Sequence, residues 1–202
     1  MKSAVAAFLI AASLAVPAWA QTGPTNDVAK VEGGQFALDK SHAKILFSVN
    51  HFGFSVYYGM FTDFDAKLQF DPKQLTKSNV DVTVQLAGID TTNPKLDAHL
   101  KSADFFDAEK FPTATFKSTA IEVTGPTTGK ITGDLTLHGV TKPVVLDATF
   151  IGGGVNGMTK AYVVGFSATA TLKRSEFGIK TYVPAVSDEV NLIISGEFDR
   201  QK

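Results

Sequence analysis

The sequence predicts an all-β protein of about eight antiparallel strands that close into a barrel or fold into a sandwich. Three observations predict this class. Apolar and polar residues alternate with a period of two in segment after segment, which gives each strand one apolar face. Pairs of turn-forming residues separate these segments. Because a single sheet cannot bury its own apolar face, the strands must enclose a shared interior.

The alternation defines the strands in chain order. In the clearest case, Phe64, Ala66, Leu68 and Phe70 alternate with charged or amide side chains. The same period indicates strands at 45–49, 64–70, 80–86, 144–150, 164–172 and 190–194, and strands also fit 114–123 and 130–137. Turns are indicated at Asp71-Pro72, Gly125-Pro126, Lys142-Pro143 and Gly152-Gly153-Gly154.

A short helical insertion is predicted near residues 94–110. Asn93 is a suitable N-cap and Pro94 suits the first helical position. Leu96 and Leu100 are four residues apart and share one face of the helix. A further short turn is expected in the second half of the insertion. The insertion therefore closes one end of the sheet or carries a long connection.

The first twenty residues are predicted to be a cleaved export signal. Lys2 gives a positive start, an apolar run follows, and Ala18-Trp19-Ala20 is a small-x-small cleavage site. The run is shorter than the ~20 residues that a membrane span requires. We therefore expect a signal peptide at 1–20, an N-terminal arm or tether at 21–35, and one barrel domain at 36–202.

The composition excludes several classes of function. The chain has no cysteine, so a large core rather than disulfides must hold an exported protein together, and cysteine-ligated metals are excluded. Without Lys2 the chain carries 18 basic and 20 acidic side chains, with no basic block. That balance gives no electrostatic surface for nucleic acid or anionic lipid. We expect neither nucleic-acid binding nor stable membrane insertion.

The four histidines show no metal-binding or catalytic spacing. No H-x-H or H-x-x-x-H motif occurs, and His42 and His51 are an odd number of residues apart, so in one strand they would face opposite sides. No G-x-S-x-G turn or phosphate-binding loop is present. We predict no metal, cofactor or catalytic residue, and expect His99 and His138 to make ordinary hydrogen bonds.

Small residues on the inward faces raise the question of a hollow interior. Because protein interiors are close-packed, small inward side chains require either large partners opposite them or a void. The 16 phenylalanines could be those partners. We favour a cavity, which would bind an apolar guest such as a long hydrocarbon chain. The small residues are Ala66, Gly133, Ala148, Ala168, Ala170 and Gly196.

Several ordered motifs resemble one known family between Phe36 and Phe198. They are DKSH (39–42), VNHFGF (49–54), GMF (59–61), DAHLKS (97–102), DFFDAEKFP (104–112), GDLTLHGVTK (133–142), RSEFGI (174–179) and SDEV (187–190). With these motifs the chain resembles the YceI-like family, the polyisoprenoid-binding, lipocalin-like proteins. The family usually has an arginine before the aspartate of the helix motif, where this chain has Leu96.

The resemblance implies an eight-stranded antiparallel lipocalin-like barrel that resides in the periplasm and has no catalytic activity. It also implies that the interior holds a polyisoprenoid or an isoprenoid quinone. From strand parity and this resemblance, we predict that the ligand-binding residues are Ile45, Phe47, Val49, Phe64, Leu68, Phe70, Val84, Phe116, Leu135, Phe166, Ala168 and Leu192.

The mouth of the pocket is predicted near His51, Tyr57, Tyr58 and Arg174. For Arg174 we favour a structural pairing with a carboxylate such as Asp188 or Glu189 over contact with a ligand headgroup. Tyr57 and Tyr58 could also support a homodimer. Two alternatives stay open: an exported enzyme that acts on a lipid or quinone with His51 or His138 as base, and a stress-induced protein that sequesters apolar compounds.

Overall fold

The computed structural model describes residues 23–202, so the predicted signal peptide lies outside the described part. The helix α1 and the short 3₁₀ helices (η) are η1 (Val28–Lys30), η2 (Lys40–His42), η3 (Leu75–Lys77), η4 (Leu86–Gly88), α1 (Pro94–Lys101) and η5 (Arg174–Phe177). The strands are β1 (Gly34–Leu38), β2 (Lys44–His51), β3 (Ser55–Phe61), β4 (Phe64–Phe70), β5 (Asn79–Gln85), β6 (Ile89–Asp90), β7 (Thr113–Val123), β8 (Thr128–Leu137), β9 (Val140–Val155), β10 (Tyr162–Lys173) and β11 (Glu189–Arg200).

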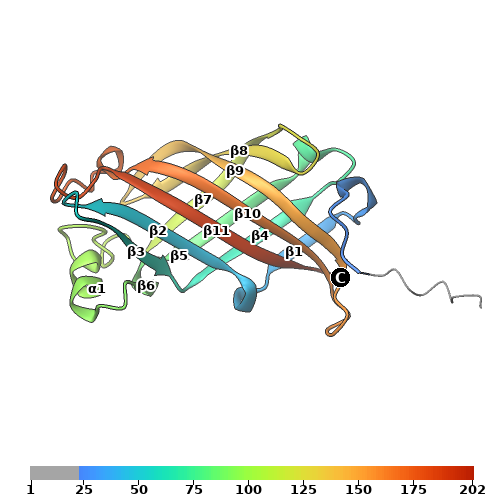
Figure 1. The fold of residues 1–202 in the computed structure, drawn as a ribbon, viewed down its shortest axis with the longest axis horizontal. Coiled ribbons are helices and arrows are strands. Elements are labelled where there is room, and N and C mark those ends of the chain that lie inside the picture. The colour runs from blue at the N-terminus through green and yellow to red at the C-terminus, as the bar shows by residue number, and fades with distance from the viewer. Residues whose placement is uncertain (1–22) are drawn as a thin grey trace, which may run out of the picture.

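The strands close into an antiparallel barrel, as predicted (Figure 1). Its ring runs β1-β4-β5-β7-β8-β9-β10-β11, and β11 returns to β1 through the pairs Phe36–Arg200 and Leu38–Phe198. Every neighbouring pair in the ring is antiparallel. Closure of this ring selects the barrel over the sandwich.

The three remaining strands lengthen the barrel beyond the ring. Strands β1 and β2 lie end to end along β11, because Phe198–Arg200 pairs with β1 and Asn191–Ser195 pairs with β2. The break between β1 and β2 is the η2 turn. Strand β3 pairs with β2 along its whole length and with β6 at Met60 and Phe61. These three strands extend one wall toward α1 (Figure 1).

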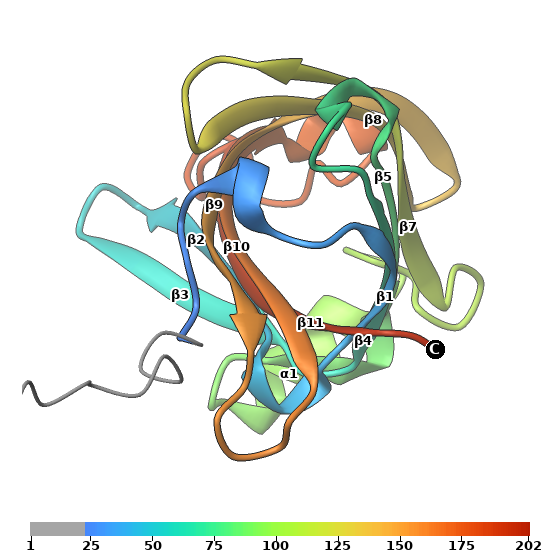
Figure 2. The same cartoon turned by 90° about the vertical axis from the view of Figure 1, so that its right-hand side faces the viewer.

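The elongated barrel has two different ends (Figure 1). At one end lie α1, the turn between β2 and β3, and the segment 174–188; we call this the helix end. At the other lie η1, η3 and the C-terminus; we call this the arm end, and Figure 2 views the barrel from it. The insertion near 94–110 thus closes one end of the sheet, one of its two predicted roles.

The helical insertion begins as predicted. The Asn93 side chain accepts hydrogen bonds from the backbone N–H groups of Lys95 and Leu96, and Pro94 is the first helical residue. The second half of the insertion consists of hydrogen-bonded turns, such as Lys110 N–H to the Asp107 carbonyl at 3.0 Å. Within the described residues, α1 and the other helices are too short to cross a bilayer.

Phenylalanine rings cluster at the arm end of the interior. The Phe70 ring lies 6.1 Å from Phe150 and 5.7 Å from Phe166, and Phe166 lies 6.2 Å from Phe198. The N-terminal segment packs against this cluster: Val31 is buried in it, and Thr25 pairs with Gly153 through two 2.9 Å backbone hydrogen bonds. Residues 23–33 therefore cover the arm end rather than forming a free tether.

Candidate functional site

An apolar cavity of about 790 Å³ occupies the barrel interior. Its volume falls in the range of roughly 300–1,000 Å³ that is usual for small-molecule sites. It reaches from Val28 and Leu75 at the arm end to Leu96 and Leu100 of α1 at the helix end. The wall includes all twelve residues that the sequence predicted, although their contact with a ligand stays a prediction: Ile45, Phe47, Val49, Phe64, Leu68, Phe70, Val84, Phe116, Leu135, Phe166, Ala168 and Leu192.

Many inward-facing side chains remain accessible from inside the barrel. On β9 the inward residues Val144, Leu146 and Ala148 line the cavity and are only partly buried. On β5 the same holds for Val80 and Val82. In a close-packed interior such residues would be fully buried. The protein's own side chains therefore leave the centre of the barrel unfilled.

Large partners explain some of the small inward residues, and the cavity explains others. A Cβ atom on Gly133 would overlap the Phe116 ring, so that ring already fills the space. Ala66 is buried in the phenylalanine cluster of the arm end. Ala66 also lines the cavity, as do Ala168 and Ala148, which pair across β10 and β9. Both explanations offered by the sequence thus apply, in different parts of the barrel.

Aromatic and histidine rings surround the helix end of the cavity, and we call this set the aromatic collar. Phe52 and Tyr182 line the cavity and are 50% and 55% exposed, so the cavity reaches solvent here. The His51 ring lies 4.7 Å from Phe52, and the Tyr182 ring lies 6.2 Å from His99. The collar consists of His51, Phe52, Tyr57, His99, Phe105 and Tyr182.

The collar includes two of the four residues predicted at the mouth. His51 and Tyr57 line the cavity. Tyr58 does not: it is 60% exposed, because neighbouring residues in a strand point to opposite faces and Tyr57 takes the inner one. The expectation for Tyr58 is therefore corrected. Four collar residues were not predicted from the sequence, although all except Tyr182 lie in the family motifs: Phe52, His99, Phe105 and Tyr182.

Arg174 is buried beside the cavity and holds the loop behind the collar. Its guanidinium donates to the carbonyls of Ser187 (2.9 Å), Val186 (2.9 Å), Thr181 (2.8 Å) and Ile179 (3.2 Å). Burial lowers the pKa of this guanidinium. With four of its five N–H groups engaged, Arg174 is a structural residue rather than a headgroup ligand.

The structural role of Arg174 was predicted, but its partners were predicted wrongly. The expected ion pair with Asp188 or Glu189 is absent from the described contacts, and backbone carbonyls take its place. Asp188 instead accepts hydrogen bonds from the backbone N–H and the hydroxyl of Ser175, at 2.8 and 2.7 Å. These two bonds are the main cause of the lowered pKa of the Asp188 carboxyl.

The position where Leu96 replaces the family's usual arginine is apolar in this chain. Leu96 lines the cavity at the helix end. The next residue, Asp97, accepts hydrogen bonds from the backbone N–H and the hydroxyl of Thr91, at 2.8 and 2.6 Å. These bonds fix α1 to the end of β6 without an ion pair from position 96.

The other histidines make local hydrogen bonds. His138 Nδ1 lies 3.1 Å from the Phe177 carbonyl oxygen, which is the ordinary bond at a strand end that was expected. His99 Nε2 lies 3.2 Å from Asp104 Oδ2. The enzyme alternative offered His51 or His138 as its base. Because His138 does not line the cavity, His51 is the candidate that remains of these two.

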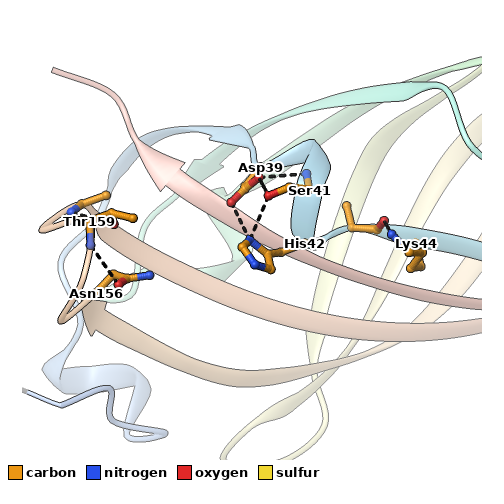
Figure 3. A network of polar contacts seen from close by, with 8 residues as sticks. Asp39, Ser41, His42, Lys44, Asn156 and Thr159 are labelled. Atoms are coloured by element: carbon orange, nitrogen blue, oxygen red, sulfur yellow. Dashed lines mark hydrogen bonds and ion pairs between the residues drawn. The ribbon is translucent and has the colours of Figure 1, made fainter.

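One cluster of possible metal ligands lies outside the cavity. Ligand atoms of Asp39, His42 and Glu197 are within 4.8 Å of one another. The Asp39 carboxylate, however, already accepts hydrogen bonds from the Ser41 backbone N–H and hydroxyl, at 2.9 and 2.6 Å, and is bonded to His42 (Figure 3). The cluster is explained as a polar network that closes the η2 turn, so we assign no metal to it.

A family model described as a YceI-like domain matches residues 36–198, nearly the whole barrel. The chain belongs to the YceI-like family. A UPF0312 protein of Ectopseudomonas mendocina is 46% identical over 176 residues, which cover 84% of this chain and 92% of that protein. Protein YceI of Escherichia coli O157:H7 is 44% identical over 171 residues, covering 83% and 87%.

Solved structures show the same fold. BcnA of Burkholderia cenocepacia superposes with a TM-score of 0.72 at 26% identity, covering 79% of this chain and 98% of BcnA. A polyisoprenoid binding domain from Saccharophagus degradans superposes with a TM-score of 0.63 at 9% identity, covering 84% of this chain and all of that domain. The YceI-like barrel is thus a fold shared well beyond the range of clear sequence similarity.

Proposed function

We propose that this YceI-like protein is a periplasmic carrier that holds a long isoprenoid lipid, either a prenyl lipid or an isoprenoid quinone, inside its barrel. The observation that carries the proposal is the continuous apolar cavity between the arm end and the aromatic collar. The predicted export signal at 1–20 supports the location, and the polyisoprenoid binding domain of the same fold supports the ligand class.

The chemistry of the wall favours a hydrocarbon guest. The wall is mostly apolar, and among the described residues no buried side-chain nitrogen or oxygen lacks a hydrogen-bond partner. The Thr91 hydroxyl, for example, lines the cavity but is already bonded to Asp97. Each buried CH₂ group of a guest contributes about 0.8 kcal/mol. A long chain therefore gains most from this site.

Mass spectrometry of organic extracts tests the ligand class directly. Protein purified from its periplasmic fraction should release a prenyl lipid or quinone in an amount close to that of the protein. Prenyl alcohols of increasing length should then bind more tightly, by roughly fourfold for each added CH₂ equivalent, until the cavity is full. The absence of prenyl lipid from several hosts, together with equal affinity along the series, would contradict the proposal.

A turnover assay separates the carrier from the enzyme alternative. The same prenyl lipids are incubated with the protein and recovered for analysis. A carrier returns them unchanged, and a His51→Gln variant gives the same result as the parent. Chemical conversion that the His51→Gln variant loses would instead favour an exported enzyme with His51 as its base.

A further inference from the structure

We propose that the turn between β2 and β3 docks the protein on the surface of a phospholipid bilayer, so that the ligand passes through the aromatic collar without crossing water. This inference rests on the proposed carrier function and adds the partner from which the ligand is taken. The turn and its flanks expose the apolar side chains of Phe52, Phe54, Val56 and Tyr58, and Phe54 is the most exposed of the four, at 91%. We call this set the apolar tip.

The apolar tip is continuous with the mouth of the cavity. Phe52 belongs both to the tip and to the cavity wall, and its ring contacts His51 of the collar. Its backbone N–H donates to the Ala185 carbonyl at 2.7 Å, which joins the tip to the loop that carries Tyr182. An apolar path therefore runs from the outer surface of the tip to the interior. A surface that bound a partner unrelated to the ligand would not need to be continuous with the cavity.

The absence of charge in the tip points to a bilayer rather than to a charged partner. From Asn50 to Thr62 the sequence contains no aspartate, glutamate, lysine or arginine. Burying this turn among acyl chains would thus desolvate no formal charge, and aromatic side chains are favoured at the boundary between headgroups and hydrocarbon. The docking is expected to depend on apolar contact and to persist at high salt, since the tip has no charge for salt to screen.

The backbone conformation at the mouth of the cavity supports a role for the rings of Phe52 and Tyr182. Phe52 and Tyr182 adopt left-handed backbone conformations, with φ of 55° and 61°. Bulky residues rarely occupy this region, and such strained positions cluster at functional sites. In this conformation both rings lie at the opening of the cavity and are half exposed.

The arm end provides a matched control. Met158, in the turn between β9 and β10, is 92% exposed and thus as accessible as Phe54. It lies outside the cavity wall, as does Phe54. Substitutions at the two positions therefore change surface apolarity equally without changing the binding site, and they differ in which end of the barrel they affect.

Phe54→Ser and Met158→Ser are compared by flotation with phosphatidylcholine vesicles and by the rate of prenyl-lipid transfer from those vesicles. Phe54→Ser should bind vesicles roughly tenfold more weakly, equivalent to about 1.4 kcal/mol, and slow the transfer by a similar factor. Met158→Ser should match the parent protein. Equal losses in the two variants, or no loss in Phe54→Ser, would overturn the proposal.

Depth-dependent quenching identifies the inserted residue. Trp19 is the single tryptophan of the sequence and lies in the predicted signal peptide, so Phe54→Trp and Met158→Trp can each be read separately in the processed protein. Phosphatidylcholine with brominated acyl chains should quench Trp at 54 and leave Trp at 158 unchanged. Emission at 54 that is already shifted to the blue without vesicles, in a protein that sediments as a dimer, would assign the tip to a second copy and reject the bilayer.

Binding of a prenyl alcohol in detergent solution distinguishes this proposal from the carrier function. Phe54→Ser should bind the alcohol with unchanged affinity, because Phe54 is not part of the cavity wall. If neither the parent nor the variant binds it, the carrier function fails, whereas vesicle flotation still decides the docking. If both bind it and neither floats with vesicles, docking fails and the carrier function stands.

Discussion

His42 Nδ1 lies 2.7 Å from Asp39 Oδ2 on the outside of the barrel, where β1 gives way to β2 (Figure 3). Hydrogen bonds from Ser41 and His42 lower the pKa of the Asp39 carboxyl to about 2, and Asp39 in turn raises the pKa of the His42 imidazole above 6.5. The pair therefore stabilises the fold at mildly acidic pH.

The pH dependence of this pair has a definite sign. The His42 contribution is fully present below pH 6.5 and is lost as the pH rises through the raised pKa of the folded state. The Asp39 contribution is present above pH 3.8 and is lost as the pH falls toward about 2. In urea unfolding across this range, Asp39→Asn should remove both dependences. NMR titration should show the His42 pKa falling toward 6.5 in that variant but staying raised in Ser41→Ala.

Removing the Arg174 side chain should destabilise the helix end. Arg174→Ala leaves four carbonyl oxygens without their donor, and we expect a loss of about 2–4 kcal/mol in the free energy of unfolding. Arg174→Lys should recover only part of this loss, because an ammonium group cannot reproduce the planar fork of donors. Chemical denaturation measures both, with the exposed neighbour Lys173→Ala as control. Full stability of Arg174→Ala would contradict the structural role.

A large side chain at position 168 should displace the ligand without unfolding the barrel. Ala168→Trp adds an indole to the cavity, where there is room for it, so the melting temperature of the lipid-free protein should change little. The amount of prenyl lipid that co-purifies, measured by mass spectrometry, should fall severalfold. The matched control is Thr169→Trp, whose side chain points outward from the same strand. Undiminished lipid in Ala168→Trp would mean that the ligand occupies another part of the barrel.

Gly133 should tolerate no added side chain. In Gly133→Ala the new Cβ would overlap the Phe116 ring and lie 2.6 Å from the Lys117 carbonyl oxygen, which should cost about 1–3 kcal/mol. Replacing the ring by a smaller side chain, in Phe116→Leu, should relieve only part of this cost in the double variant, because the contact with the Lys117 carbonyl oxygen remains. Calorimetry on the double-mutant cycle measures the coupling. Gly157→Ala, with open space around it, should be neutral within about 0.5 kcal/mol.

The period-two pattern, together with the family resemblance, predicted the residues of the barrel wall. Alternate residues from Phe64 to Phe70 and along β10 were predicted to face inward, and residues of both segments line the cavity. The prediction works because alternate side chains of a strand point to the same face, whatever the neighbouring strands are. The same rule also excludes Tyr58 from the mouth once Tyr57 is placed inside, but the two were grouped by proximity in sequence alone.

The mouth was harder to predict because it is assembled from irregular segments. His99 and Phe105 come from the helical insertion, whereas Tyr182 comes from a loop about eighty residues later in the chain. No periodicity relates such positions. The partners of Arg174 were missed for a similar reason: the sequence shows which carboxylates are near, but backbone carbonyls become acceptors only when a loop folds around the guanidinium.

The partly buried valines and leucines on the inner faces of β5 and β9 have a thermodynamic consequence. The polypeptide alone does not complete its own core, and the proposed guest would supply the missing atoms. Occupancy and heat resistance are then linked: a guest at a hundred times its dissociation constant would add about 2.7 kcal/mol to the stability of the folded state. Preparations stripped of lipid to different extents should melt at different temperatures, so the melting curve itself would report how many molecules are loaded.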